Sequence, residues 1–292
     1  MEDNADKPPP TENIINSSEL WAPQAWAHLQ SLRKASPLIQ CITNFVSMDL
    51  VANTLLSAGA SPVMIHSVEE IPDFTPKVHA LYVNVGTLVP NWLSAMKMAV
   101  QVAKESNKPW VLDPVAAGSS GFRLKACLEL LKMGPNVVRG NGSEIMALFK
   151  GSVEENSKGA DSILESTDAI EAAKYLAQIS GSVVAVSGAV DIVTDGNQLV
   201  GVNNGVSMLQ KITATGCAVT ALIAAFVAID PLHPFEATAT ALSVFGVASE
   251  VGMGKARGPA SLRIGLVDSL HWLDQDTLLR NVKISNLLWL AS

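Results

Sequence analysis

The chain has few of the features that mark secreted, membrane-spanning or nucleic-acid-binding proteins. Its three cysteines, Cys41, Cys127 and Cys217, are an odd, widely spaced set without a CxxC pair, which predicts neither a disulfide framework nor a zinc site. The 20 Lys and Arg residues form no dense run and the net charge is −7, which argues against a nucleic-acid partner. The longest apolar stretch is about twelve residues, short of the roughly 20 that cross a bilayer, so we expect no membrane-spanning segment.

The N-terminal segment lacks the apolar core of a secretory signal peptide, and its acidity argues against a transit peptide. Residues 1–18 are polar and contain Pro8, Pro9 and Pro10 in a row, which is typical of a disordered tail. A hydrophobic content of 48% is ample for a sizeable core. We therefore expect a cytoplasmic protein in a reducing compartment, with residues 19–292 forming a single domain.

Helical and strand-like patterns alternate along most of the chain. Helical spacing of apolar residues occurs in residues 44–61, where it ends at Gly59, and in residues 91–107 and 168–180. Short apolar runs typical of buried strands occur in residues 62–67, 79–88, 109–115 and 182–188, while residues 136–149 combine a strand, a turn and a helix. This alternation predicts an α/β fold around a mostly parallel sheet.

The rhythm changes near Val190. Residues 190–205 contain two alternating runs around Asp195 and Gly196, which predicts a hairpin and an antiparallel edge of the sheet. Apolar helices are expected after it, at residues 216–229 and about 235–252. Residues 154–167 are polar and without periodicity, and we interpret them as a loop. No internal repeat or domain boundary is evident.

Polar residues stand directly after the predicted strands. They are Asn44, residues 64–67, residues 84–87, Asp113, residues 139–144, Ser187 and Gly188. Ligands of open α/β sheets gather at the carboxyl ends of the strands, so the recurrence favours a site. Each residue alone has a structural explanation as a turn or helix cap. The sequence has no Walker-type G-x-x-x-x-G-K-[ST] motif and no G-x-G-x-x-G after a strand, which excludes a P-loop and disfavours a dinucleotide site.

Three of these residues suggest phosphate and metal chemistry. Asp113 follows a short apolar strand and precedes Pro114, so it is held rigidly and could bind a metal or orient water. Arg139 is a permanent cation suited to phosphate. Glu144 could bind Mg²⁺ directly or through water. Ser143 precedes an apolar helix and fits equally well as its N-cap.

The stretch "ITATGCAVTALIAAF" places small residues at the start of an apolar helix. Residues 213–216 are small enough for an anion to approach the free N–H groups of the first turn, where the helix dipole is positive. The helix behind is apolar all round and should be buried. The same field would favour the thiolate of Cys217. The alternative, a small buried residue that fills space, has equal support from the spacing.

Several segments together resemble the hydroxyethylthiazole kinase family. They are "PLIQCITNFVSMDLVANTLLSAGASPVM", "VNVGTL", "VLDPVAAGSSGFR", "VVRGNGSEIMAL", "VAVSGAVDIVTDG", "ITATGCAVTALIAAF" and "GPASLRIGLVDSLHWL", in this order from about residue 20 to 273. The sequence is most similar to plant members, which share "IQCITNFVSMDL" and "ITATGC". The resemblance implies a ribokinase-like three-layer sandwich and a homotrimer with active sites at subunit interfaces. It also implies Mg²⁺-assisted transfer of the γ-phosphoryl group of ATP to the primary alcohol of 4-methyl-5-(2-hydroxyethyl)thiazole in thiamine salvage.

The resemblance also implies a role for each matching position. The thiazole site would be formed by Met64, Ala214, Asn44, Val46 and Gly86, the ATP site by Arg139, Ser187 and Asn141, the Mg²⁺ site by Asp113 and Glu144, and the catalytic anion hole by Thr215, Gly216 and Cys217. Cys217 stands where most of the superfamily carries an Asp that accepts the substrate proton. The chain departs from the family in two places: Ala214 replaces a frequent Gly, and Ser187 replaces a Thr common in bacterial members.

Three rival interpretations stay open on the residues. The first is a kinase of the same fold that acts on another small alcohol, such as hydroxymethylpyrimidine. The second is a nicotinamide-nucleotide-hydrate dehydratase, and the third is a non-catalytic ligand-binding relative. Cys217 and the segment "CITNFV" favour the thiazole over the pyrimidine. Asp113 and Glu144 argue against simple binding, which needs no metal-site acids.

Overall fold

The computed structural model describes residues 18–156 and 169–287. The helices are α1 (Ser18–Ala35), α2 (Met48–Ala58), α3 (Ile71–Phe74), α4 (Pro90–Glu105), α5 (Gly121–Leu131), α6 (Gly142–Asn156), α7 (Ala169–Ser180), α8 (Thr215–Ile229), α9 (Pro234–Met253), α10 (Pro259–Trp272) and α11 (Gln275–Asn281). The strands are β1 (Leu38–Ile42), β2 (Ser61–Val63), β3 (Ala80–Asn84), β4 (Trp110–Asp113), β5 (Val137–Asn141), β6 (Val183–Ser187), β7 (Asp191–Thr194), β8 (Leu199–Val202) and β9 (Ile284–Asn286).

The strands form one nine-stranded sheet in the order β2-β1-β3-β4-β5-β6-β7-β8-β9. The pairs from β2 through β6 are parallel, and those from β6 through β9 are antiparallel. The predicted α/β fold with a mostly parallel sheet is therefore confirmed. The predicted hairpin at residues 190–205 is also confirmed, because β7 and β8 pair antiparallel around Gly196, whose φ is +92°. Strand β9 was not predicted.

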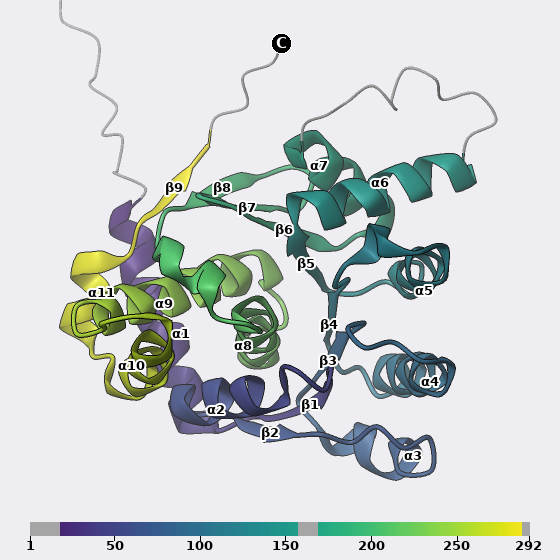
Figure 1. Cartoon of the computed structure of the whole chain (residues 1–292), viewed down its shortest axis with the longest axis horizontal. Coiled ribbons are helices and arrows are strands. Elements are labelled where there is room, and N and C mark those ends of the chain that lie inside the picture. The colour runs from purple at the N-terminus through teal and green to yellow at the C-terminus, as the bar shows by residue number, and fades with distance from the viewer. Residues whose placement is uncertain (1–17, 157–168, 288–292) are drawn as a thin grey trace, which may run out of the picture.

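Helices cover both faces of the sheet and make three layers (Figure 1). Helices α3 to α7 lie on one face, and α1, α2 and α8 to α11 lie on the other. Each face has its own core of buried apolar side chains. Helix α8 is the centre of the second core, since every residue from position 218 to 227 is buried. The expectation of a helix that is apolar all round is confirmed.

Two local expectations differ from the structure. The strand expected at residues 62–67 ends at Val63, so Met64 already lies beyond the carboxyl end of β2. The loop expected at residues 154–167 begins later, because α6 continues to Asn156. Residues 157–168 and the predicted tail before Ser18 lie outside the described residues. Among the residues described, no helix combines the length and apolarity that crossing a membrane requires.

Candidate active site

A pocket of about 680 Å³ opens at the carboxyl ends of the central strands, a size typical of small-molecule sites. Its walls come from the ends of β4, β5 and β6, from the start of α8, and from the loop after β8 with the facing part of α9. These walls include Asp113, Arg139, Asn141, Glu144, Ser187, Ala214, Thr215, Gly216 and Cys217. The structure thus brings nine of the predicted site residues into one cavity.

The start of α8 offers free backbone N–H groups to this pocket. Ala214 precedes the helix with a φ of +67°, and no side chain caps the helix start. The N–H of Ala218 makes the first bond inside the helix, to the carbonyl of Ala214 at 2.9 Å. The N–H groups of Thr215, Gly216 and Cys217 therefore have no intrahelical acceptor, and they carry the positive end of the helix dipole. This arrangement can hold an anion.

Gly216 and Thr215 contribute backbone rather than side chain. A Cβ on Gly216 would lie 2.8 Å from Nη1 of Arg139, so the glycine is what lets the guanidinium approach the helix start. The Thr215 hydroxyl is turned toward the preceding turn, where it lies 3.2 Å from the carbonyl oxygens of Leu209 and Ile212. The cation of Arg139 and the free N–H groups consequently converge on one volume.

The Cys217 thiol is half-buried and is a neutral group at neutral pH. Its pKa is raised to about 11, first by burial and then by the charge of Asp113, while hydrogen bonds with Asn84, Asn44 and Ser47 oppose the rise. The thiolate that the helix field was expected to favour is disfavoured here, because desolvation and a nearby carboxylate raise the pKa of the thiol. The Nδ2 group of Asn44 lies 3.5 Å from the sulfur and orients it.

A buried polar network connects the Cys217 side of the pocket to Asp113. The Asn84 amide, fully buried, donates to the Asp113 carboxylate at 2.8 Å and to the Tyr82 hydroxyl at 2.7 Å. Its oxygen accepts from Nδ2 of Asn44 and from the N–H of Gly86, both at 2.9 Å. Parallel strand pairing explains why the Asn84 and Asp113 side chains are in contact, since the two residues are register partners on β3 and β4.

Asp113 is 2% exposed and accepts a second bond, from the Tyr82 hydroxyl at 2.9 Å. The pKa of its carboxyl is raised to about 6, mainly by burial, while the Arg139 cation opposes this rise and the Glu144 charge adds to it. A carboxylate that is costly to keep charged in this place is stabilised by any cation that enters the pocket.

Glu144 and Asn141 form a capping box at the start of α6. The Asn141 side-chain oxygen accepts from the N–H of Glu144 at 2.9 Å, and Oε2 of Glu144 accepts from the N–H of Asn141 at 2.7 Å. Oε1 of Glu144 accepts from the N–H of Ala116 at 2.8 Å. Ser143 only donates to Asn141, so the N-cap expected at Ser143 belongs to Asn141 instead.

The donor set available to a metal is small. The part of the chain that the structure describes contains no group of three or more His, Cys, Asp or Glu side chains that could hold an ion. Asp113 and Glu144 both line the pocket. Two carboxylates fit Mg²⁺, which is usually held by one or two protein acids, several waters and substrate phosphates. They do not fit a closed zinc or calcium site, which takes more protein ligands.

The predicted ATP-binding residues Arg139 and Ser187 also line the pocket. Asp191, which the sequence analysis did not select, lines it beside them. Nε of Arg139 is buried without a hydrogen-bond partner. Burial raises the pKa of Asp191 while the Arg139 charge lowers it, and Asp191 accepts from the N–H of Gly188 at 3.0 Å. Asp191 begins an antiparallel strand, so the rule that points to carboxyl ends of parallel strands does not single it out.

The thiazole positions divide into two groups. Asn44 and Gly86 lie together beside Cys217, and a Cβ on Gly86 would come within 2.6 Å of Nδ2 of Asn44. Ala214 lines the pocket. Val46 is 60% exposed and Met64 packs partly buried against the α8 core. Of the five thiazole positions Ala214 belongs to the pocket wall, while Asn44, Gly86, Val46 and Met64 do not.

The sequence reasoning also missed the wall opposite these residues. The loop at residues 204–207 and the α9 residues Leu242, Phe245 and Gly246 line the pocket. They come from a loop after an antiparallel strand and from the middle of a helix, where no motif marks them. Gly205 is a local sequence signal of an unusual loop, because glycine readily adopts the φ of +122° found there.

Known proteins resemble this chain over nearly its whole length. The sequence model of the hydroxyethylthiazole kinase family matches residues 29–276. A hydroxyethylthiazole kinase of Arabidopsis thaliana is 63% identical over 267 residues, which cover 91% of this chain and 96% of the relative. A solved hydroxyethylthiazole kinase structure from Pyrococcus horikoshii has a TM-score of 0.82 at 38% identity, covering 90% of this chain and 99% of its own.

More distant structures share the fold. A ribokinase-like superfamily protein of Enterococcus faecalis superposes with a TM-score of 0.58 at 10% identity, over 83% of this chain and 88% of its own. The nine-stranded sheet and its helical layers are therefore a ribokinase-like fold, as the resemblance of the sequence implied.

Proposed function

The chain belongs to the hydroxyethylthiazole kinase family, and from this premise we propose how its pocket performs the reaction. The protein phosphorylates the primary alcohol of 4-methyl-5-(2-hydroxyethyl)thiazole in thiamine salvage, with ATP as the co-substrate. The observation that carries the mechanism is the convergence of Arg139 and the α8 N–H groups, with Asp113 lining the same pocket. A group with several negative oxygens matches this set of donors.

The transferred phosphoryl group is held by the start of α8. The N–H groups of Thr215, Gly216 and Cys217 bind its oxygens, and Arg139 balances the remaining charge. Phosphoryl transfer has a loose transition state, so most of the catalysis is positioning and electrostatic stabilisation. The rigid, fully buried body of α8 supports this role, because the N–H groups cannot move away from the charge.

Mg²⁺ fits the pocket beside Asp113 and Glu144. When bound, it would neutralise phosphate oxygens of ATP. The raised pKa of Asp113 supports this placement, since a carboxylate costly to bury gains most from a cation. The two oxygens of Glu144 already accept backbone N–H groups, which supports a contact through water.

Cys217 orients the alcohol rather than deprotonating it strongly. Its pKa of about 11 leaves almost no thiolate at neutral pH. A loose transition state releases the hydroxyl proton late, so a strong base is not required. Asn44 lies beside the sulfur, held there by the space that Gly86 leaves, and supplies a polar group near which the thiazole alcohol is placed.

ADP release tests the substrate. Thiazole alcohol should support turnover well above that of hydroxymethylpyrimidine, pyridoxal or simple alcohols at equal concentration. Faster turnover of the pyrimidine would instead assign the chain to the neighbouring kinase class. Dehydration of a hydrated nicotinamide nucleotide would point to a dehydratase, and ligand binding without ADP release to a non-catalytic relative.

We further propose a homotrimer with active sites between subunits, as in the family that the sequence resembles. Phe45 and Val46 support it, since they are 68% and 60% exposed and adjoin Asn44. Light scattering of the purified protein measures the mass directly, and a monomer would contradict the proposal. A cytoplasmic location is the matching proposal for the chain, whose three cysteines are free thiols.

A further inference from the structure

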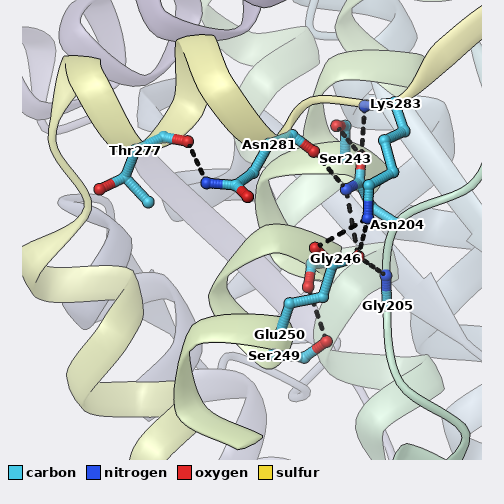
Figure 2. A network of polar contacts seen from close by, with 9 residues as sticks. All are labelled: Asn204, Gly205, Ser243, Gly246, Ser249, Glu250, Thr277, Asn281 and Lys283. Carbon is cyan, nitrogen blue, oxygen red and sulfur yellow. Dashed lines mark hydrogen bonds and ion pairs between the residues drawn. The ribbon is translucent and has the colours of Figure 1, made fainter. Parts of the chain in front are cut away.

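The pocket wall formed by the loop after β8 is held by a network of polar contacts (Figure 2). Asn204 is its centre. Nδ2 of Asn204 donates to the carbonyl of Asn281 at 2.7 Å and to Oε1 of Glu250 at 3.2 Å. Oδ1 accepts from the Ser243 hydroxyl at 2.6 Å and from the N–H of Lys283 at 2.8 Å. The amide thus uses both donors and both acceptor positions, which fixes its orientation.

Glu250 holds the backbone of the same loop. Its Oε1 accepts from the N–H of Gly205 at 2.9 Å, and the Lys283 ammonium lies 3.4 Å away. Gly205 has a φ of +122°, a conformation that other residues rarely adopt. A charged acceptor on a backbone N–H is among the stronger hydrogen bonds of a protein. The carboxylate therefore fixes the loop at the residue whose backbone conformation is unusual.

One face of α9 serves this loop. Ser243, Gly246 and Glu250 are spaced three and four residues apart, so they lie along one side of the helix. A Cβ on Gly246 would lie 2.5 Å from Cβ of Asn204, which means that the loop rests directly on the helix backbone. The helix thereby presents two polar anchors with a gap between them that fits the loop.

The order of strands in the sheet indicates which end of a bound ligand lies against the loop after β8. The residues beside the thiol, Asn44 and Gly86, follow β1 and β3, while the groups for the phosphoryl follow β4 and β5 or begin α8. The Asn204 loop follows β8, on the far side of the phosphoryl groups from the thiol. A molecule whose terminal phosphate lies at α8 extends its other end toward this loop.

We propose that Asn204 and Glu250 are positioning residues for ATP, which fix the loop at residues 204–206 as the wall that receives the nucleoside end of the nucleotide. The proposal rests on the proposed phosphoryl transfer at α8. The two residues act on nucleotide affinity through the loop backbone. They leave thiazole binding and the transfer step itself unchanged.

The test compares variants in the full-length protein. Asn204→Ala and Glu250→Ala should raise KM for ATP and Kd for ADP about tenfold, the order expected from losing a charge-assisted hydrogen bond. Both should keep kcat and KM for the thiazole within about twofold of the wild type. A less ordered loop weakens the binding of ATP equally in the ground state and the transition state, which changes KM for ATP and not kcat. Glu250→Gln should restore most of the ADP affinity, since its oxygen still accepts from Gly205.

Asn281→Ala is the matched control. Its side chain donates only to the carbonyl of Thr277 within α11, at 2.8 Å, and its own carbonyl remains for Asn204. This variant should lose stability without losing ADP affinity. If an alanine variant does not fold, Ser243→Ala is the milder test, because it removes one donor to Asn204, and a several-fold rise in Kd for ADP is expected.

Unchanged ADP affinity in folded Asn204→Ala and Glu250→Ala would overturn the proposal and leave the network with a purely structural role at the edge of the sheet. An equal rise of KM for the thiazole would overturn it too. Calorimetric ADP binding does not depend on the alcohol. A failure of the wild type to phosphorylate the thiazole would therefore count against the proposed function alone.

Discussion

At the scale of single residues, two glycines decide which side chains can enter the site. Gly86 makes room for the Asn44 amide, since a Cβ there would lie 2.6 Å from Nδ2 of Asn44. Gly216 makes room for the Arg139 guanidinium, since a Cβ there would lie 2.8 Å from Nη1 of Arg139. Neither has a positive φ, so close approach and not backbone conformation explains them. A glycine at such a position leaves room for the side chain of another residue, and its loss should affect function more than folding.

The variant Gly216→Ala tests this explanation. The added methyl group should displace Arg139 and lower kcat/KM by about 100-fold, the order seen when one oxyanion-type contact is lost. The free energy of unfolding should change by less than about 1 kcal/mol, because alanine is the better helix former. Steady-state kinetics and urea unfolding measure the two effects, and parallel losses of activity and stability would favour simple packing.

The reactivity of Cys217 tests its raised pKa. Since the pKa is about 11, alkylation by iodoacetamide should be slow at pH 7 and rise about tenfold per pH unit up to at least pH 9.5. Cys41 and Cys127 are 0% exposed and should stay unmodified in the folded protein, so mass spectrometry reports one site. Reaction that levels off between pH 7 and 8 would show a thiolate and restore a base role for Cys217.

At the scale of elements, register and helix starts assemble the site. Asn84 pairs with Asp113, and Asn141 pairs with Ser187, so polar residues at the ends of parallel strands meet at one edge. Helix α8 then brings its free N–H groups to this edge through Ala214, which adopts the left-handed conformation. Alanine there carries a backbone strain that glycine does not.

Ala214→Gly should therefore be tolerated or stabilising. Release of the strain is worth about 1–2 kcal/mol, and the greater freedom of glycine in the unfolded chain offsets about 0.4–1 kcal/mol of it. We expect a free energy of unfolding that is equal or up to about 1 kcal/mol higher, with kcat retained. Ala221→Gly, inside the buried part of α8, is the control and should destabilise. A clear loss of stability in Ala214→Gly would show that the methyl group packs.

At the scale of the whole molecule, the site is a line across the sheet. The thiol and its amide neighbours lie at the β1 and β3 end, the acids and Arg139 follow β4 and β5, and the Asn204 loop closes the β8 end. ATP and an alcohol can lie along this line with the transferred group in the middle. Stability and ligand binding are therefore coupled, because the ligands bind the folded pocket and not the unfolded chain.

Thermal unfolding with ADP and Mg²⁺ tests the metal placement on this scale. ADP at about 100 times its Kd should raise Tm by on the order of 5 °C, and Mg²⁺ should add a further rise. Asp113→Asn should keep the ADP effect and lose the magnesium increment. Asp276→Asn, an exposed acid in α11, is the control and should behave as the wild type. A full increment in Asp113→Asn would place the metal elsewhere.

The sequence by itself determined the alternation of helices and strands along most of the chain, the antiparallel hairpin, the buried α8 and the polar edge of the sheet, but not β9 or α5. Periodicity and turn residues are local, so these features follow from neighbours in the chain. It could not determine the capping by Asn141, the raised pKa of Cys217, the position of Asp191 beside Arg139 or the polar network around Asn204. Each of these depends on burial or on contacts between distant segments, which only the tertiary structure brings together.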